Sequence, residues 1–94
     1  MTEDPTSSRT WAALLAAMDG AHLPCRGGKG VEWTSDDPAE QARAARWCQP
    51  CVARTACLGH ALAVQDNYGV LGGQTSAQRK AELRKRRRAQ KAAA

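Results

Sequence analysis

Residues 48–57 read CQPCVARTAC and hold three of the chain's four cysteines. Cys48 and Cys51 flank a two-residue turn, which is the separation that lets two thiolates reach one metal ion or cluster. Cys57 follows after five residues, on a further predicted helix, and Cys25 lies upstream in a glycine-rich loop. The pattern predicts one site built from all four thiols, in which Cys25 ties the loop to the central helices.

The spacing alone leaves the bound group open. A structural zinc site more often has two close cysteine pairs or a Cys2His2 set, whereas this chain has one close pair. Four unevenly spaced thiolates also suit the corners of a [4Fe–4S] cluster. Disulfides or free thiols are a third alternative, although a reducing cytosol disfavours disulfides. His60 and His22 are expected to be a surface histidine and a loop histidine rather than ligands.

A cross-link through such a four-thiol site is needed because the sequence has few large hydrophobic side chains to form a core. The 94 residues include seven Leu and four Val, no Phe, no Ile, and 19 small alanines. Large aliphatic and aromatic side chains at this frequency rarely hold a domain together by burial alone. No glycine-rich phosphate loop, Ser-His-Asp set or paired acidic site is evident, so we expect no enzyme.

Hydrophobic spacing and helix caps predict an all-α fold of about four short helices with a glycine-rich turn. Thr10 is expected to cap the first helix, and Asp37 with Pro38 the second. The last helix is expected to begin after Thr75 or Ser76. The expected helices cover residues 11–18, 38–48, 52–65 and 77–90. The expected domains are a flexible leader at 1–9, a cluster-binding and sigma-binding domain at 10–75, and a basic DNA-binding helix or tail at 76–94.

Positive charge is concentrated at the C-terminal end. Residues 79–94 carry eight Lys and Arg against one Glu, whereas residues 1–78 carry six against eight Asp and Glu. A dense basic segment attracts polyanions by releasing counterions, so DNA phosphates are the predicted partner and an anionic membrane surface the second. A tail that only solubilises the protein is the plain alternative. The predicted DNA contacts are Arg79, Lys80, Arg84, Lys85, Arg86, Arg87, Arg88 and Lys91.

Nothing in the sequence predicts a membrane span or a secretion signal. No apolar run approaches the ~20 residues of a transmembrane helix, and the chain starts with acidic Glu3 and Asp4. We therefore expect a cytoplasmic protein. The close cysteine pair could also exchange thiols, but no strand-rich stretch precedes Cys48 as it does in thioredoxin-like proteins.

Three features together resemble the WhiB-like (Wbl) family of actinobacterial iron–sulfur transcription regulators. They are the cysteine pattern, the turn Gly69-Val70-Leu71-Gly72-Gly73, and the basic C-terminal helix. The resemblance covers about residues 10–90. It implies that Cys25, Cys48, Cys51 and Cys57 ligate a [4Fe–4S] cluster. It also implies that the protein, as a monomer, binds region 4 of the primary sigma factor within RNA polymerase. A zinc-stapled nucleic-acid-binding module is the alternative, and a protein disulfide reductase is a third.

The resemblance also implies sigma-binding residues. The family turn is usually Gly-Val/Ile-Trp-Gly-Gly, and its Trp packs on the sigma factor, whereas this chain has Leu71. Trp33 matches a family aromatic that covers the cluster or touches sigma, and Trp11 matches an N-terminal tryptophan; core packing is the alternative for both. The expected sigma contacts are Trp11, Trp33, Val70, Leu71, Gly72 and Gly73. Pro50 precedes the third cysteine rather than following it, and the tail lacks the Arg-Gly-Arg-Pro hook of some relatives.

Overall fold

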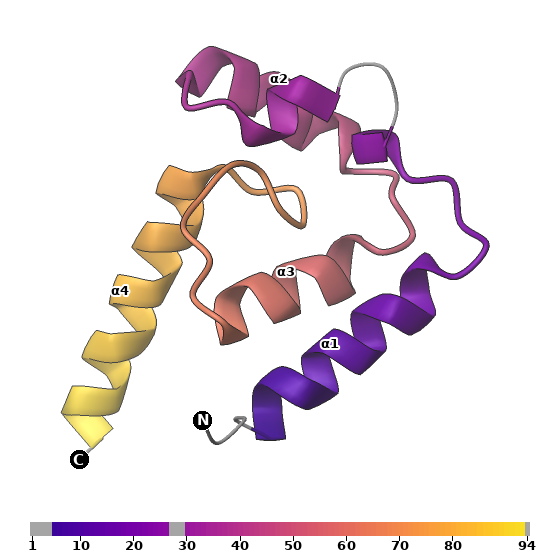
Figure 1. Ribbon diagram of the computed structural model, residues 1–94. Helices are drawn as coiled ribbons and strands as arrows, with labels where there is room; N and C mark the ends of the chain where they lie inside the picture. Colours follow the sequence, from indigo (N-terminus) through magenta and orange to yellow (C-terminus); the bar gives the residue numbers. More distant parts are fainter. Residues whose placement is uncertain (1–4, 27–29, 94) are drawn as a thin grey trace.

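The computed structural model describes residues 5–26 and 30–93, and this part of the chain is helical (Figure 1). This part of the chain contains no β-strand, and its one isolated β-bridge pairs Leu71 with Gln74. The all-α prediction is therefore confirmed. The elements are α1 (Pro5–Met18), η1 (Pro24–Arg26), η2 (Gly30–Thr34), α2 (Pro38–Trp47), α3 (Arg54–Ala63) and α4 (Ser76–Ala93).

Helix α1 begins earlier than the sequence indicated. It starts at Pro5, where a proline costs no helical hydrogen bond, and Thr10 lies inside it. The Thr10 hydroxyl donates to the Ser7 carbonyl at 3.0 Å instead of capping the helix. The prediction of a leader that lasts to residue 9 is therefore wrong from Pro5 onward, and its residues 1–4 lie outside the described part.

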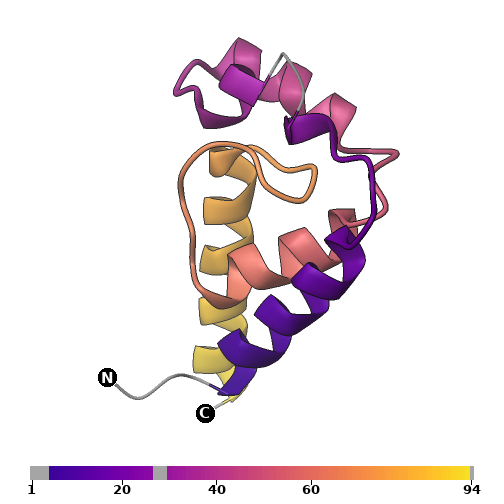
Figure 2. The same cartoon turned by 45° about the vertical axis from the view of Figure 1, so that its right-hand side comes forward.

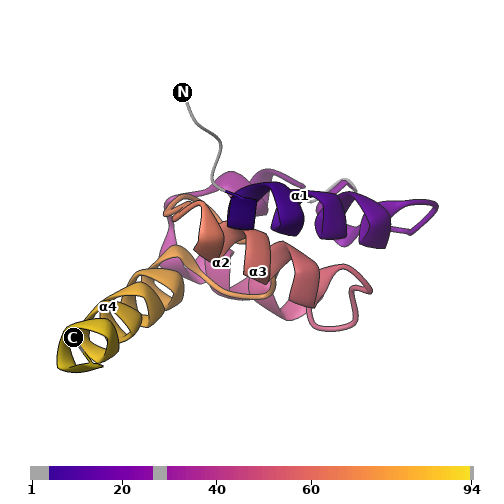
Figure 3. The same cartoon turned by 90° about the horizontal axis from the view of Figure 1, so that it is seen from below.

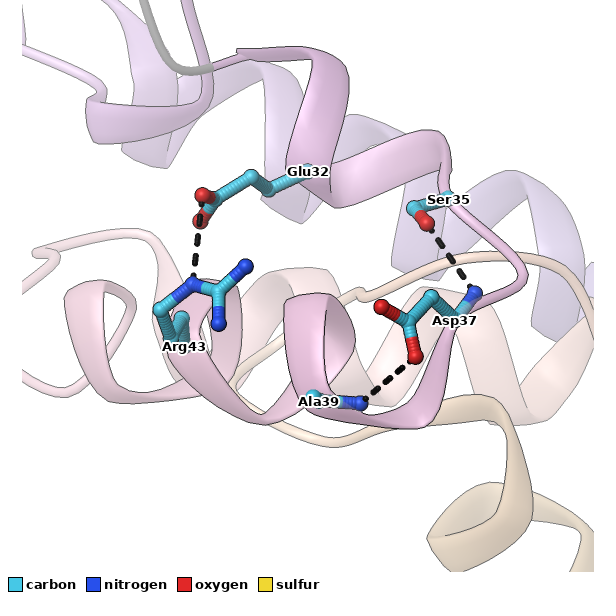
Figure 4. Close-up of polar contacts among 5 residues, drawn as sticks. All are labelled: Glu32, Ser35, Asp37, Ala39 and Arg43. Carbon is cyan, nitrogen blue, oxygen red and sulfur yellow. Dashed lines mark hydrogen bonds and ion pairs between the residues drawn. The ribbon is translucent and has the colours of Figure 1, made fainter.

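Helix α2 begins as predicted, and Figure 4 shows its first turn. The Asp37 carboxylate accepts from the Ala39 N–H at 3.2 Å, and the Asp37 N–H donates to the Ser35 hydroxyl at 3.0 Å. An ion pair of 3.3 Å between Arg43 and Glu32 ties the helix to η2 (Figure 4). These contacts fix the direction in which α2 leads toward the first of the clustered cysteines.

The last helix also starts at a predicted cap. The Thr75 hydroxyl accepts from the Gln78 N–H at 3.2 Å, and the Gln78 side chain accepts from the Thr75 N–H at 2.8 Å. This reciprocal pair satisfies two backbone donors at the start of the helix. Helix α3, by contrast, begins at Arg54 rather than near Val52, which lies exposed in the turn before it.

The helices form two groups. Helices α1 and α3 lie side by side, α2 lies with η2 at one end, and α4 extends away from the others (Figures 1 and 3). Figure 2 shows the segment between α3 and α4 looping up toward α2 before α4 begins. That loop carries the glycine turn into the space between the two groups.

The core has two small buried clusters, in which large side chains are mixed with alanine and cysteine. One contains Trp33 and Val70 with two alanines of α2 and Cys48. The other contains Leu14 and Leu23 with Ala53, and the partly buried Cys51 and Cys57 pack against it. Three of the four cysteines are therefore part of the packing itself, as a core short of large side chains requires.

Arg79 is fully buried, with 0% of its surface exposed. Its guanidinium donates to four backbone carbonyls, those of Asp66 at 3.1 Å, Tyr68 at 2.6 Å, Gly69 at 2.9 Å and Gln74 at 2.6 Å. Burial lowers the pKa of Arg79, and the neighbouring Asp66 carboxylate partly opposes this shift. The DNA contact predicted for Arg79 is wrong, because this side chain fastens the α3–α4 loop to α4.

We predict that Arg79→Met destabilises the protein by roughly 2–4 kcal/mol, because four buried carbonyls lose their donor. Arg84→Met is the matched control on the same helix, where the side chain is exposed, and should cost about 0.5 kcal/mol or less. Urea unfolding followed by circular dichroism measures both. Equal losses for the two variants would contradict the role assigned to Arg79.

Candidate functional site

The four cysteines line one cavity of about 530 Å³. Cys25 comes from η1, Cys48 from the end of α2, Cys51 from the turn that follows, and Cys57 from α3. The structure thus brings together thiols that are up to 32 positions apart in the sequence (57 − 25). The site joins the first loop, α2 and α3.

Backbone hydrogen bonds position the clustered thiols. Cys48 ends α2, where its N–H reaches the carbonyls of the last helical turn. The Cys51 N–H donates to the Cys48 carbonyl at 3.0 Å, which closes the turn between them. The Cys57 N–H donates to the Ala53 carbonyl at 2.8 Å in the first turn of α3. Two helix ends and one tight turn therefore set the three sulfurs.

Burial and mutual repulsion disfavour the thiolate forms. Burial raises the pKa of Cys25 and of Cys57, and the other cysteines of the cavity raise both pKa values further. Arg26 opposes the shift at Cys25, and a hydrogen bond from the Gly72 backbone opposes it at Cys57. The repulsion reflects how close the thiols are, and metal binding at this site has to displace protons.

Thiolates are soft ligands that select iron–sulfur clusters, zinc or Cu(I). In a tetrahedral zinc site with Zn–S near 2.3 Å, the sulfurs stand about 3.8 Å apart. Within residues 5–26 and 30–93, no three Cys, His, Asp or Glu side chains form a group that could hold one metal ion. The four cysteines line one cavity, and a set of four thiols suits either a metal ion or a cluster.

Two further groups donate to these sulfurs. The Trp33 indole N–H donates to the Cys48 sulfur at 3.1 Å, and both side chains are buried. The Gly72 backbone donates toward the Cys57 sulfur from the glycine turn. The Val70 N–H donates to the Trp33 carbonyl at 2.7 Å, which joins the turn to η2. Sequence reasoning missed both donors, because each depends on a contact between distant segments.

Three of the expected sigma contacts point inward. Val70 is 1% exposed, Trp33 is 7% exposed and Gly72 is buried. In this structure the three residues offer little or no accessible surface for a sigma contact, which stays a prediction. Trp33 packs in a buried cluster, as its core-packing alternative predicted.

The other three expected contacts retain accessible surface. Trp11 is 49% exposed, and Leu71 and Gly73 are half-buried at the rim of the glycine turn. The Trp11 ring lies 5.2 Å from the His60 ring, centroid to centroid, and His60 Nδ1 is within hydrogen-bond distance of the Thr10 hydroxyl at 2.9 Å. His60 therefore links α3 to α1.

Apart from Arg79, the predicted DNA-binding side chains are exposed on α4. Arg86 forms an ion pair of 3.0 Å with Glu82 one helical turn earlier, and such an exposed pair adds little to stability. The exposed cations on α4 are Lys80, Arg84, Lys85, Arg86, Arg87, Arg88 and Lys91.

No helix in the described part of the chain is long and apolar enough to cross a membrane.

Comparisons with known proteins identify the family to which this chain is similar. A family model described as "Transcription factor WhiB" matches residues 20–81, which is more than half of the chain and includes all four cysteines. Transcriptional regulator WhiB7 of Mycolicibacterium smegmatis (strain ATCC 700084 / mc(2)155) is 36% identical over 52 residues, which are 55% of this chain and 50% of that protein. The chain thus matches about half the length of this curated relative. No solved structure matches the chain.

The close approach of the glycine turn to α3 predicts a large difference between two substitutions. Gly72 and Gly20 both have left-handed backbones, with φ of 61° and 68°. A Cβ at Gly72 would collide with the Leu58 backbone beside Cys57, whereas a Cβ at Gly20 meets nothing within 4 Å. Gly20→Ala should cost about 1 kcal/mol, from backbone strain alone.

Gly72→Ala should cost several times more, because the turn must move away from α3 and its hydrogen bond to Cys57 is lost. Urea unfolding of both variants measures the difference. A Gly72→Ala protein as stable as Gly20→Ala would show that the turn does not press against α3.

Proposed function

This chain belongs to the WhiB family of transcription factors, and from that premise we propose that it regulates transcription through a [4Fe–4S] cluster held by its four cysteines. The observation that carries the proposal is that Cys25, Cys48, Cys51 and Cys57 line one cavity. The family match confirms the resemblance predicted from the sequence and is one to transcription factors.

The cavity favours a cluster over a single zinc ion. Four thiolates from η1, the end of α2, the turn that follows and α3 can each bind one iron of a cubane, and all four line one cavity. When bound, the cluster supplies one-electron redox chemistry and a covalent cross-link between the elements. The four cysteines would hold it, the burial of Cys48 would keep water from that ligand, and hydrogen bonds from Trp33 and Gly72 would reach the sulfurs of Cys48 and Cys57.

The proposed partners are region 4 of the primary sigma factor within RNA polymerase and the DNA phosphate backbone. Trp11, Leu71 and Gly73 are the expected sigma contacts that keep accessible surface. The exposed cations of α4 lie beyond the family match except for Lys80, so DNA binding is proposed from charge and geometry. The protein would act in the cytoplasm, as a monomer bound to sigma, and promoter choice would come mainly from the polymerase.

The first test is the visible spectrum of anaerobically purified protein, with iron, sulfide and zinc assayed on the same sample. We expect a brown protein with a broad shoulder near roughly 400 nm and about four irons per chain. Cys57→Ser should lose this absorbance and most of the iron, because it removes one of the four ligands. A colourless protein with one zinc per chain would overturn the cluster and favour a zinc-stapled nucleic-acid-binding module.

The second test separates DNA binding from sigma binding. Replacing Arg84, Arg87 and Arg88 with alanine removes three exposed cations from α4 and keeps good helix formers. We expect weaker binding to duplex DNA and a log K against log[salt] slope that is shallower by up to about 3, with sigma region 4 binding unchanged.

The control removes three exposed cations from other elements, with Arg9, Arg26 and Arg46 replaced by alanine. This variant has the same net charge as the α4 variant, so a purely nonspecific charge effect would weaken both equally. Equal weakening, or loss of sigma binding in the α4 variant, would contradict the proposed division of roles.

A further inference from the structure

A buried indole donor faces a buried cysteine sulfur beside the cavity. The Trp33 Nε1 atom lies 3.1 Å from Cys48 Sγ, and the two residues are 7% and 8% exposed. A buried N–H without an acceptor costs about 1–3 kcal/mol, so the pairing satisfies a donor that packing has removed from water. The hydrogen bond is thus part of the packed core and not a surface contact.

The donor is held at both ends. The Trp33 carbonyl accepts from the Val70 N–H at 2.7 Å, and the ring packs in the cluster formed with Val70 and the α2 alanines. Cys48 is fixed by backbone hydrogen bonds at the end of α2. Neither partner can turn away without breaking the core, so the N–H stays directed at the sulfur.

Such a donor acts differently on the two redox states of a cluster. Reduction adds negative charge that is shared by the irons and their sulfurs, and hydrogen bonds to the sulfurs stabilise that charge. The apolar side chains around Trp33 keep the local dielectric low, which strengthens the interaction. A ring without an N–H would pack at the same place but would not stabilise the reduced state.

We infer that Trp33 is a positioning residue that raises the reduction potential of the cluster by donating its indole N–H to the Cys48 sulfur. The inference rests on the proposed function, because it requires a cluster ligated by Cys48. It gives Trp33 a role that its low exposure allows.

The test compares Trp33→Phe with Trp47→Phe in anaerobically purified, iron-assayed protein. Trp47 is 50% exposed and directly precedes Cys48, so it controls for the loss of an indole near the same ligand. Reductive titration followed by electron paramagnetic resonance measures the midpoint potential. We expect a shift to more negative potential in Trp33→Phe and the wild-type value in Trp47→Phe. Equal potentials in wild type and Trp33→Phe would overturn the inference.

A second measurement holds even if Trp33→Phe fails to fold. The chain has three tryptophans, so Trp11→Phe/Trp47→Phe protein grown with 15N-indole tryptophan carries the label at Trp33 alone. Electron–nuclear double resonance on the reduced cluster should detect coupling to this nitrogen and to an exchangeable proton.

The outcomes separate the two proposals. Cluster-containing protein without that coupling overturns the role of Trp33 and leaves the proposed function intact. Wild-type protein without iron and sulfide overturns the proposed function and the inference with it.

Discussion

The rest of the structure depends on the convergence of four thiols from η1, the end of α2, a tight turn and α3. No large aliphatic core links these elements, because the two buried clusters of the described residues hold only two leucines, one valine and one tryptophan beside alanines and Cys48. Ligation free energy is folding free energy when the site joins elements that do not otherwise pack strongly. Binding of a metal or cluster by the four thiols is therefore coupled to folding, and its loss would affect every element that lines the cavity.

The glycine turn shows how that coupling reaches the surface. The Val70 N–H donates to the Trp33 carbonyl, and Gly72 lies against the α3 backbone beside Cys57. The conformation of the turn therefore depends on the thiol site. Leu71 and Gly73 extend from the same turn and keep accessible surface. A partner that contacts Leu71 and Gly73 therefore depends on the conformation that the cavity gives to the turn. The structure thereby offers a short physical connection between the proposed cluster and the proposed sigma contacts.

Local signals in the sequence predicted the local features. Asp37 and Pro38 fixed the start of α2, and Thr75 fixed the start of α4, because capping depends on residues three or four positions apart. Features made by distant segments were not predictable. In the sequence, Arg79 is one more cation of a basic run. Only the folded loop supplies the four carbonyls that accept hydrogen bonds from its buried guanidinium. Trp33 was likewise expected to cover the cluster, to contact sigma or to pack in the core, and only the folded chain places the Cys48 sulfur beside its indole N–H.

Arg79 also determines what kind of basic element the C-terminus is. A disordered tail would present its cations in every direction, and each contact with a phosphate would have to overcome the entropy of ordering the chain. Here the first cation of the run is turned inward to anchor α4, and Leu83 one turn later is buried as well. The cations from Arg84 onward are therefore carried on a helix with a fixed start. On such a helix the cations have fixed positions relative to the thiol site. A partner bound at that site would therefore determine which DNA phosphates these cations can contact.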